Sequence, residues 1–214
     1  MTFDQMRKSY QLSGLSEREV HADPLEQFRL WFHQANSDDV PSWLELNAMT
    51  LATSGADGRV TSRIVLLKGI ENGCFLFFTN YDSAKARQMA ENPYVSLCFL
   101  WPHLERQVRV NGKVSKTSRE TSISYFKSRP RGSQLGALIS NQSAPLPDRD
   151  ALEESMKRYE AQHQDQEIPC PENWGGYAVA PEEIEFWQGR ENRLHDRIVY
   201  RKAEAGWSTV RLAP

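Results

Sequence analysis

Three side chains that can carry positive charge stand at alternate positions in the segment Arg193–Leu194–His195–Asp196–Arg197. In a β-strand, residues two apart share one face, so the spacing predicts Arg193, His195 and Arg197 side by side. These groups repel one another unless an anion or an electron-rich ring lies against them. The segment therefore predicts a site for a phosphate or an electron-rich heterocycle. The alternative is an exposed edge strand whose charges discourage aggregation.

A second pair of cations, Arg63 and Lys68, brackets the four aliphatic residues 64–67. This pattern predicts a strand whose middle is buried and whose ends reach solvent. Arg63 and Lys68 are an odd number of positions apart, which places them on opposite faces of a regular strand. One strand could then serve two different anions. The alternative is that the charges only mark the strand ends, as Lys and Arg commonly do.

Basic residues are concentrated between residues 104 and 131, where eight of them stand against Glu105 and Glu120. The whole chain is slightly acidic, with 26 Lys and Arg, 28 Asp and Glu, and a formal net charge of −2. A local basic excess on an acidic protein fits a small anionic ligand better than a nucleic-acid backbone. The alternative is a solvated basic face. We therefore expect a small-molecule ligand and no nucleic-acid partner.

Several other kinds of site have no support in the sequence. It contains no P-loop, no Gly-x-Gly-x-x-Gly after a strand, and no His or Cys pair at metal-ligand spacing. No metal site is predicted. Charged residues make up 25% of the chain, and no run approaches the roughly 18 apolar residues of a transmembrane helix. The three widely spaced cysteines and the polar N-terminus predict a cytoplasmic protein with reduced thiols and no membrane partner.

The elements that must position these side chains begin after a polar arm. Residues 1–22 contain few large aliphatic residues and are predicted to be a flexible arm without its own core. Asp23–Pro24–Leu25–Glu26 has the form of a capping box, and apolar residues continue at helical spacing to about residue 35. No linker interrupts the rest of the chain, so residues 23–214 are expected to form one domain.

Turn signals divide the next part of the chain into strands. Residues 48–54 and 60–68 flank Gly55–Ala56–Asp57–Gly58, a sequence typical of a hairpin. Asn72–Gly73 precedes an apolar strand at 74–79. These short strands joined by tight turns indicate antiparallel pairing.

The second half of the chain alternates between strand and helix signals. Asn111–Gly112 predicts a turn, and Ser118 and Asp148 are expected to cap helices within residues 118–165. A short helix is also predicted at 83–92, and further strands at 106–110, 113–116, 174–179, 184–188, 195–201 and 207–212. This order predicts an α+β fold, in which helices flank an antiparallel, barrel-like sheet.

Four longer motifs resemble one known family. They read RIVLLK at 63–68, ERQVRV at 105–110, YFKSRPRGSQLGA at 125–137 and FWQGRENRLHDR at 186–197. Their joint occurrence in this order resembles the pyridoxamine 5'-phosphate oxidase family, and the resemblance covers nearly the whole chain.

The resemblance implies an FMN-binding split β-barrel and a cytoplasmic homodimer with FMN at the subunit interface. It also implies the oxidation of pyridoxamine or pyridoxine 5'-phosphate to pyridoxal 5'-phosphate, a reaction of vitamin B6 salvage and biosynthesis. Dioxygen would be the electron acceptor, and hydrogen peroxide would be released.

The resemblance also assigns residues by their motifs. Arg193 and His195 are expected to hold the substrate ring against the flavin as the catalytic pair, while Arg7 and Tyr10 match an arm that closes over the site. The expected FMN-binding residues are Arg63, Val65, Leu66, Lys68, Phe78, Thr79, Lys85, Gln107, Gln142, Ser143, Trp187 and Arg197. The expected substrate-phosphate residues are Lys68, Tyr125, Arg129 and Ser133.

One position departs from the family pattern, and two other functions remain open. Many members read Ser-Arg-Lys where this chain reads Ser83–Ala84–Lys85, so one guanidinium near the FMN phosphate is missing. The alternatives are a flavin enzyme of the same barrel class that uses a nicotinamide or deazaflavin donor, and a flavin- or pyridoxal-phosphate-binding protein without turnover. The complete substrate pocket together with Arg193 and His195 favours the oxidase.

Overall fold

A single long strand, β7 (Trp174–Gln188), connects the two ends of the structure. It pairs with β6 (Arg106–Lys116) along most of its length. The first half of β7 also pairs with β4 (Cys74–Asn80), and its second half pairs with β8 (Asp196–Ala203). The computed structural model describes residues 2–5, 8–37, 40–164 and 166–214.

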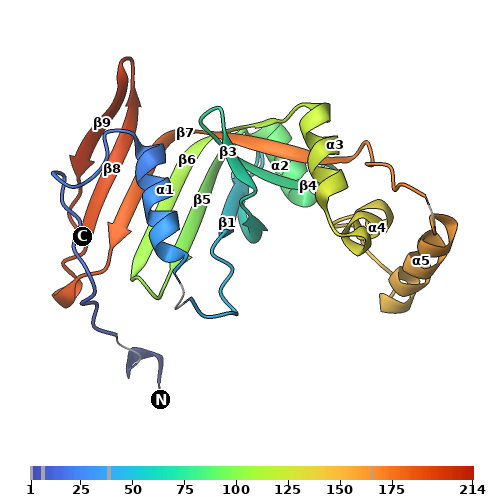
Figure 1. The fold of residues 1–214 in the computed structure, drawn as a ribbon, viewed down its shortest axis with the longest axis horizontal. Helices are drawn as coiled ribbons and strands as arrows, with labels where there is room; N and C mark the ends of the chain where they lie inside the picture. The colour runs from blue at the N-terminus through green and yellow to red at the C-terminus, as the bar shows by residue number, and fades with distance from the viewer. Residues whose placement is uncertain (1, 6–7, 38–39, 165) are drawn as a thin grey trace.

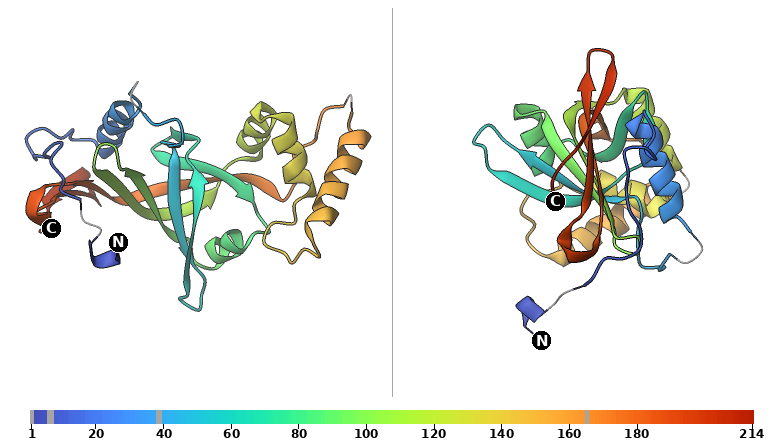
Figure 2. Two further views of the ribbon diagram at one scale, coloured as in Figure 1. Left: turned by 90° about the horizontal axis from the view of Figure 1, so that it is seen from below. Right: turned by 90° about the vertical axis from the view of Figure 1, so that its left-hand side faces the viewer.

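The remaining strands extend the sheet on both sides of β7. They are β1 (Ala48–Ser54), β2 (Val60–Leu66), β3 (Gly69–Glu71), β5 (Tyr94–Trp101) and β9 (Gly206–Arg211). Within the described residues the nine strands form one sheet in the order β2-β1-β5-β6-β7-β4-β3, with β8 on β7 and β9 on β8. Every pairing is antiparallel. The curled sheet in Figures 1 and 2 confirms the predicted antiparallel, barrel-like architecture.

Two predicted strand breaks are wrong, and they lie opposite each other. Asn111–Gly112 is a β-bulge inside β6, not a turn, and β7 runs without interruption through the predicted gap between residues 179 and 184. Gly112 pairs with Pro181, and a Cβ built on Gly112 would lie 2.1 Å from the Ala180 carbonyl oxygen. The glycine is therefore needed for close backbone approach at the bulge.

No strand is predicted between the helix at 83–92 and residue 106, but the structure has β5 there, directly after Asn92–Pro93. It alternates inward and outward along its length, and its Leu97, Phe99 and Trp101 side chains are fully buried. This strand supplies much of the core beneath β1 and β6.

The predicted first and second helices are confirmed. α1 (Pro24–Ala35) begins where Asp23 Oδ1 accepts the Leu25 N–H at 2.8 Å. The predicted capping box is one-sided, because the Glu26 carboxylate pairs instead with Arg29 at 2.6 Å. α2 (Ala84–Glu91) occupies the predicted short helix between β4 and β5.

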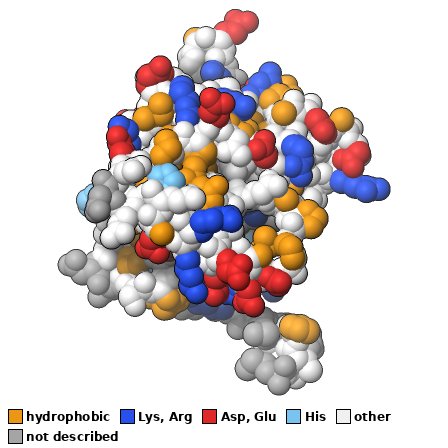
Figure 3. Space-filling view, turned by 90° about the vertical axis from the view of Figure 1, so that its right-hand side faces the viewer, with side chains coloured by type: hydrophobic (Ala, Val, Ile, Leu, Met, Phe, Trp, Pro, Cys, Tyr) orange, Lys and Arg blue, Asp and Glu red, His pale blue; other side chains and the backbone are white. Residues whose placement is uncertain are grey.

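Three further helices gather at one end of the sheet: α3 (Arg119–Ser128), α4 (Arg131–Ile139) and α5 (Arg149–Gln162). The predicted caps are confirmed, since Ser118 Oγ accepts the Thr121 N–H at 3.1 Å and Asp148 Oδ1 accepts the Ala151 N–H at 2.8 Å. Figure 3 views the molecule from this end and shows basic, acidic and hydrophobic side chains interspersed on its surface.

Two hydrophobic clusters hold these layers together. In the larger one, Phe28 of α1 lies edge-on to Phe75 and Phe99, each at 5.0 Å between ring centroids, and Trp31 meets Phe186 at 5.1 Å. The smaller cluster lies under α3 and α4 and contains Phe126, Leu135, Ile168 and Trp174. Among the described helices, none is both long and apolar enough to cross a membrane.

Candidate functional site

A cavity of about 880 Å³ lies between the sheet and the helices α2, α3 and α4. Four of its lining residues are cations: Arg63, Lys68, Lys85 and Arg129. In the part of the chain that the structure describes, no Asp, Glu or His lines this cavity. Four cations that share one cavity without an acid repel one another, so the cavity is suited to anionic groups.

Arg63 enters the cavity from the middle of β2. Its guanidinium donates to the Leu51 carbonyl at 3.0 Å and to Thr53 Oγ1 at 2.6 Å, and it also contacts Thr61 Oγ1. Burial lowers the pKa of Arg63 below its ordinary value. Neutral partners therefore fix the guanidinium without neutralising it.

The predicted division of Arg63 and Lys68 between two strand faces is wrong. β2 ends at Leu66, so Lys68 lies beyond the regular strand, and both cations line the same cavity. The predicted burial of residues 64–67 also fails at Ile64, which lines the cavity and is 63% exposed.

Lys85 is buried in the first turn of α2. Its ammonium donates to Thr79 Oγ1 at 3.0 Å, Ser83 Oγ at 3.1 Å and Gln142 Oε1 at 2.8 Å. Burial, and then the positive charge of Arg63, lower the pKa of Lys85 to about 8. An anion beside these two cations would favour the charged form of the lysine.

The loop after α4 brings Gln142 and Ser143 to the same corner. Ser143 adopts a left-handed backbone conformation (φ 71°), and its Oγ accepts the Ala84 N–H at 3.2 Å. Ala84 stands where the family pattern described above has an arginine, and it lies on the cavity wall. The corner therefore contains Arg63 and Lys85 together with neutral amide and hydroxyl groups.

Arg129 and Lys68 form a second cationic group in the cavity. The Arg129 guanidinium carbon lies 4.7 Å from the centre of the Trp174 ring, and Lys68 Nζ lies 5.9 Å from the centre of Tyr125. Arg129 Nη1 is buried and has no hydrogen-bond partner among the described residues. Among the described cavity residues no acid pairs with Arg129, so its guanidinium is available to an anionic ligand.

Aromatic rings form the wall beside this second group. Tyr125 of α3 stacks on Phe78 of β4 with ring centroids 4.0 Å apart, and Phe78 stacks on Trp174 at 5.7 Å. Ser133, at the start of α4, completes the predicted substrate-phosphate set. The sequence offered no signal for Trp174, because its role depends on which side of β7 faces the cavity.

The donor set suits two phosphate esters. Arg63, Lys85, Gln142 and Ser143 gather at one corner, and Lys68, Arg129, Tyr125 and Ser133 line another part of the same cavity. Each group combines guanidinium and ammonium donors with hydroxyl groups, which is the chemistry that recognises phosphate. The residues of the cavity thus fit a phosphorylated cofactor and a phosphorylated substrate.

A different part of the chain holds Trp187 and His195. Their rings lie 4.6 Å apart, and Tyr10 from the N-terminal arm lies 5.7 Å from Trp187 and 5.6 Å from His195. The Arg190 N–H donates to His195 Nδ1 at 3.1 Å, so a neutral imidazole carries its proton on Nε2. Burial, and then the charge of Arg193, lower the pKa of His195.

The predicted shared strand face of Arg193, His195 and Arg197 is wrong. Residues Glu191–Arg193 form a 3₁₀ turn in which Asn192 and Arg193 have positive φ, and β8 begins only at Asp196. Arg197 lies in β8 opposite Trp187. Its Nε donates to the buried Glu185 carboxylate at 2.7 Å, which raises the pKa of Arg197.

The predicted site residues therefore fall into two groups within one chain. The cavity contains Arg63, Val65, Leu66, Lys68, Phe78, Thr79, Lys85, Tyr125, Arg129, Ser133, Gln142 and Ser143. Tyr10, Gln107, Trp187, Arg193, His195 and Arg197 do not line it. The β8 end and the α3–α5 end lie at opposite ends of the molecule (Figures 1 and 2). Arg7 lies outside the described residues.

Comparison with known proteins identifies relatives over the whole chain. Residues 40–163 match the family described as pyridoxamine 5'-phosphate oxidase, and residues 174–214 match the pyridoxine 5'-phosphate oxidase C-terminal dimerisation region. A pyridoxine/pyridoxamine 5'-phosphate oxidase of Rhodopirellula baltica is 56% identical over 99% of this chain and 96% of its own length. One of Leptospira interrogans is 52% identical over 98% of this chain and 97% of its own length.

Two solved structures share the fold. PhzG from Burkholderia lata, in complex with tetrahydrophenazine-1-carboxylic acid, has a TM-score of 0.88 and 26% identity, covering 97% of this chain and all of that one (100%). A pyridoxamine 5'-phosphate oxidase-related, FMN binding protein from Nostoc punctiforme has a TM-score of 0.71 and 16% identity, covering 94% of this chain and 98% of that one. These structures confirm the predicted split-barrel fold.

Proposed function

This chain belongs to the pyridoxamine 5'-phosphate oxidase family, and on this premise we propose that it uses FMN to oxidise pyridoxamine or pyridoxine 5'-phosphate to pyridoxal 5'-phosphate. Dioxygen is the electron acceptor, and hydrogen peroxide is released. The observation that carries the proposal is the cavity in which two cationic groups stand without any acidic lining residue among those described.

In this proposal the corner of Arg63 and Lys85 holds the FMN phosphate. The Gln142 amide and the Ser143 hydroxyl add neutral contacts to the phosphate and the ribityl chain. Lys68 and Arg129 hold the substrate phosphate, with Tyr125 and Ser133 as hydroxyl donors. The guanidinium of Arg129 supports this division, because its Nη1 has no hydrogen-bond partner among the described residues.

The protein's main task is then to hold the substrate ring in place. Bound FMN supplies hydride acceptance and its own reoxidation by dioxygen. Anchoring the distant phosphate at Lys68 and Arg129 provides binding energy that orients the reacting carbon. Arg193 and His195 hold the pyridine ring on its other side. With its proton on Nε2, His195 presents a donor to that ring.

We further propose that the complete site forms between two copies of the chain. The cavity residues and the group around His195 are at opposite ends of one protomer, so a single protomer does not unite them. A homodimer in which the His195 end of one copy covers the cavity of the other would do so. The C-terminal match to a dimerisation region and the exposure of Ile64 beside the cavity support this arrangement.

The proposal is tested on the purified full-length protein. It should carry a flavin absorption spectrum that bleaches when pyridoxamine 5'-phosphate is added without air and returns when air is admitted. Oxygen consumption should accompany steady turnover with pyridoxamine or pyridoxine 5'-phosphate. Pyridoxamine without its phosphate should be a poor substrate, since Lys68 and Arg129 would have no partner. A spectrum that shifts on substrate binding but never bleaches would instead establish a binding protein without turnover.

A further inference from the structure

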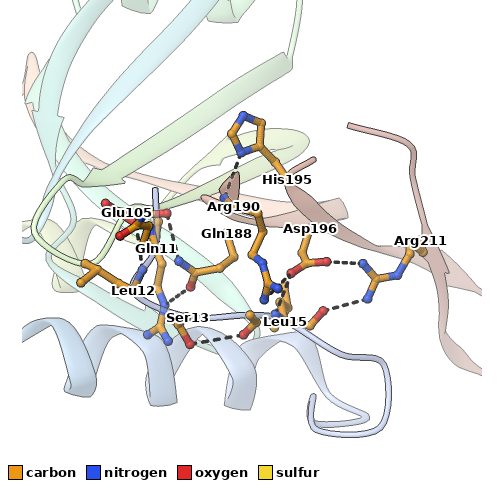
Figure 4. Close-up of polar contacts among 12 residues, drawn as sticks. Gln11, Leu12, Ser13, Leu15, Glu105, Gln188, Arg190, His195, Asp196 and Arg211 are labelled. Carbon is orange, nitrogen blue, oxygen red and sulfur yellow. Dashed lines mark hydrogen bonds and ion pairs between the residues drawn. The ribbon is translucent and has the colours of Figure 1, made fainter. Parts of the chain in front are cut away.

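The N-terminal arm crosses the end of the sheet that carries His195, and two carboxylates hold its backbone (Figure 4). Glu105 accepts the N–H groups of Gln11 and Leu12 at 2.8 and 3.2 Å. Asp196 accepts the N–H of Leu15 at 3.0 Å. Leu15 itself is buried in the main core. The arm is thus fixed at two points by backbone contacts that do not depend on its side chains.

Glu105 is well suited to fix the arm because its side chain is only 3% exposed. One carboxylate oxygen receives the two arm N–H groups, and the other lies 3.4 Å from the ammonium of Lys8. A buried carboxylate that loses these donors would be left without compensation. Glu105 and the arm therefore stabilise each other.

The backbone of Glu105 points to the same role. Its φ is +55°, in the left-handed region that glycine adopts more readily than other residues. The tight turn after Trp101 would accordingly be easier to form with glycine at this position. The strain is tolerated where a glutamate contributes a contact that glycine cannot make.

Glu105 also joins the arm to the turn that follows β7. Its carbonyl accepts the Gly189 N–H at 2.8 Å and the Gln188 side-chain amide at 3.3 Å. Gly189 in turn packs closely against Tyr10, since a Cβ at Gly189 would be 2.8 Å from Tyr10 Cγ. One residue therefore contacts both the arm and the surface on which the arm's aromatic ring rests.

We propose that Glu105 is a positioning residue that acts through Tyr10. By holding the backbone at Gln11 and Leu12, it presents the Tyr10 ring edge-on to Trp187 and His195. The placement of these three rings prepares the surface that holds the substrate ring. This inference rests on the proposed oxidase function for its kinetic consequence, but the docking of the arm does not.

The first test measures the arm directly in full-length protein. In the unaltered chain, the amides of Gln11 and Leu12 should be protected from hydrogen–deuterium exchange. Glu105→Ala should speed their exchange by at least about tenfold, because it removes two bonds to a charged acceptor. Glu105→Gln keeps an acceptor and should preserve most of the protection. The matched control is Glu182→Gln, because Glu182 is an exposed carboxylate that pairs with Lys113. This substitution should leave the exchange of the Gln11 and Leu12 amides unchanged.

Equal exchange in Glu105→Ala and the unaltered chain would overturn the docking role. Glu105→Gly addresses the possibility that Glu105→Ala disturbs the turn, because it relieves the backbone strain while removing the carboxylate. If Glu105→Gly keeps the arm protected, the proposal is wrong.

The second test separates positioning from general structural support. Glu105→Ala should raise the KM for pyridoxamine 5'-phosphate by about tenfold with a much smaller change in kcat, and Glu105→Gln should restore most of the loss. If Glu105 acts through Tyr10, adding Glu105→Ala to Tyr10→Ala should change KM little further. Additive effects on KM would overturn this coupling. A chain that shows arm docking but never bleaches its flavin would contradict the oxidase and leave the docking result intact.

Discussion

The ammonium of Lys85 lies 3.0 Å from the hydroxyl oxygen of Thr79. All three of its hydrogen-bond acceptors are neutral oxygens, and the nearby Arg63 adds a second positive charge. The corner is therefore built to receive negative charge and lacks it in the protein alone. Protonation of Lys85 therefore adds to the attraction that this corner exerts on a phosphate.

We expect the affinity for FMN to fall as the pH rises above about 8, where Lys85 loses its proton. Phosphate is already close to doubly charged above about pH 7, so it does not cause this change. In Lys85→Arg the side chain stays charged, and the affinity should remain nearly flat over the same range. Both proteins are titrated with FMN at several pH values, and binding is detected by quenching of flavin fluorescence. The titrations give the change of FMN affinity with pH for each protein.

The matched control for this substitution is Lys116→Arg. Lys116 is an exposed lysine whose Nζ lies 4.1 Å from the Tyr81 ring centre. It should keep the slope of the unaltered chain. If Lys85→Arg shows that same slope, Lys85 is not the group responsible.

Arg129→Ala should raise the KM for pyridoxamine 5'-phosphate by about 10- to 100-fold while leaving FMN binding nearly unchanged. The guanidinium is held over the Trp174 ring with one donor atom unpaired, so its loss removes substrate contacts above all. Arg129→Lys should recover only part of the loss, because a lysine keeps the charge but neither the fork nor the flat stacking surface. Steady-state kinetics and FMN titration on the same preparations provide the comparison.

Lys127→Ala, two residues before Arg129 in the last turn of α3, removes an exposed cation that pairs with Glu167 at 2.6 Å. This substitution should change neither the KM for pyridoxamine 5'-phosphate nor the affinity for FMN. An unaltered KM in Arg129→Ala would remove Arg129 from the substrate-phosphate site.

Local signals in the sequence predicted the elements that local chemistry determines. Asp23, Ser118 and Asp148 each cap a helix through their own side-chain oxygen, as expected from residue type alone. The Gly55–Gly58 turn likewise joins two paired strands. Such features depend on a few neighbouring residues, so a single sequence is enough to identify them.

The site was less predictable because it depends on where strands end and what lies across from them. Arg63 and Lys68 share a cavity only because β2 stops at Leu66, and the 3₁₀ turn before β8 separates Arg193 from Arg197. Periodicity describes a regular strand and does not indicate its last residue. Glu185, which pairs with Arg197 from the neighbouring strand, could be found only from the register of the sheet.

Gly112→Ala should lower the free energy of unfolding by about 3 kcal/mol, because the new methyl group would collide with backbone atoms that cannot rotate away. The nearest is the Ala180 carbonyl oxygen at 2.1 Å. Urea unfolding of both proteins gives the difference. Gly132→Ala is the control, since a Cβ there meets no atom within 4 Å and the helix α4 favours alanine. A loss in Gly112→Ala no larger than that in Gly132→Ala would contradict the tight packing at the bulge.

A site shared between two copies of the chain predicts complementation between Arg63 and Arg197. Arg63 lines the cavity, whereas Arg197 is held by Glu185 and the Ala213 carbonyl in the other group. Arg63→Ala and Arg197→Ala should each release FMN on dialysis. Arg201→Ala is the matched control: it also breaks an arginine–glutamate pair between β8 and β7, and should retain the cofactor.

A mixed dimer of Arg63→Ala and Arg197→Ala protomers, purified through two different affinity tags, distinguishes the two arrangements. If each site takes Arg63 from one copy and Arg197 from the other, one site is intact and the other carries both substitutions. The mixed dimer should then retain about half of the flavin of the unaltered protein. If both arginines served a site within one chain, every site would carry one substitution and the mixed dimer would lose its flavin. Full retention by Arg197→Ala alone would show that this arginine does not hold FMN in either arrangement.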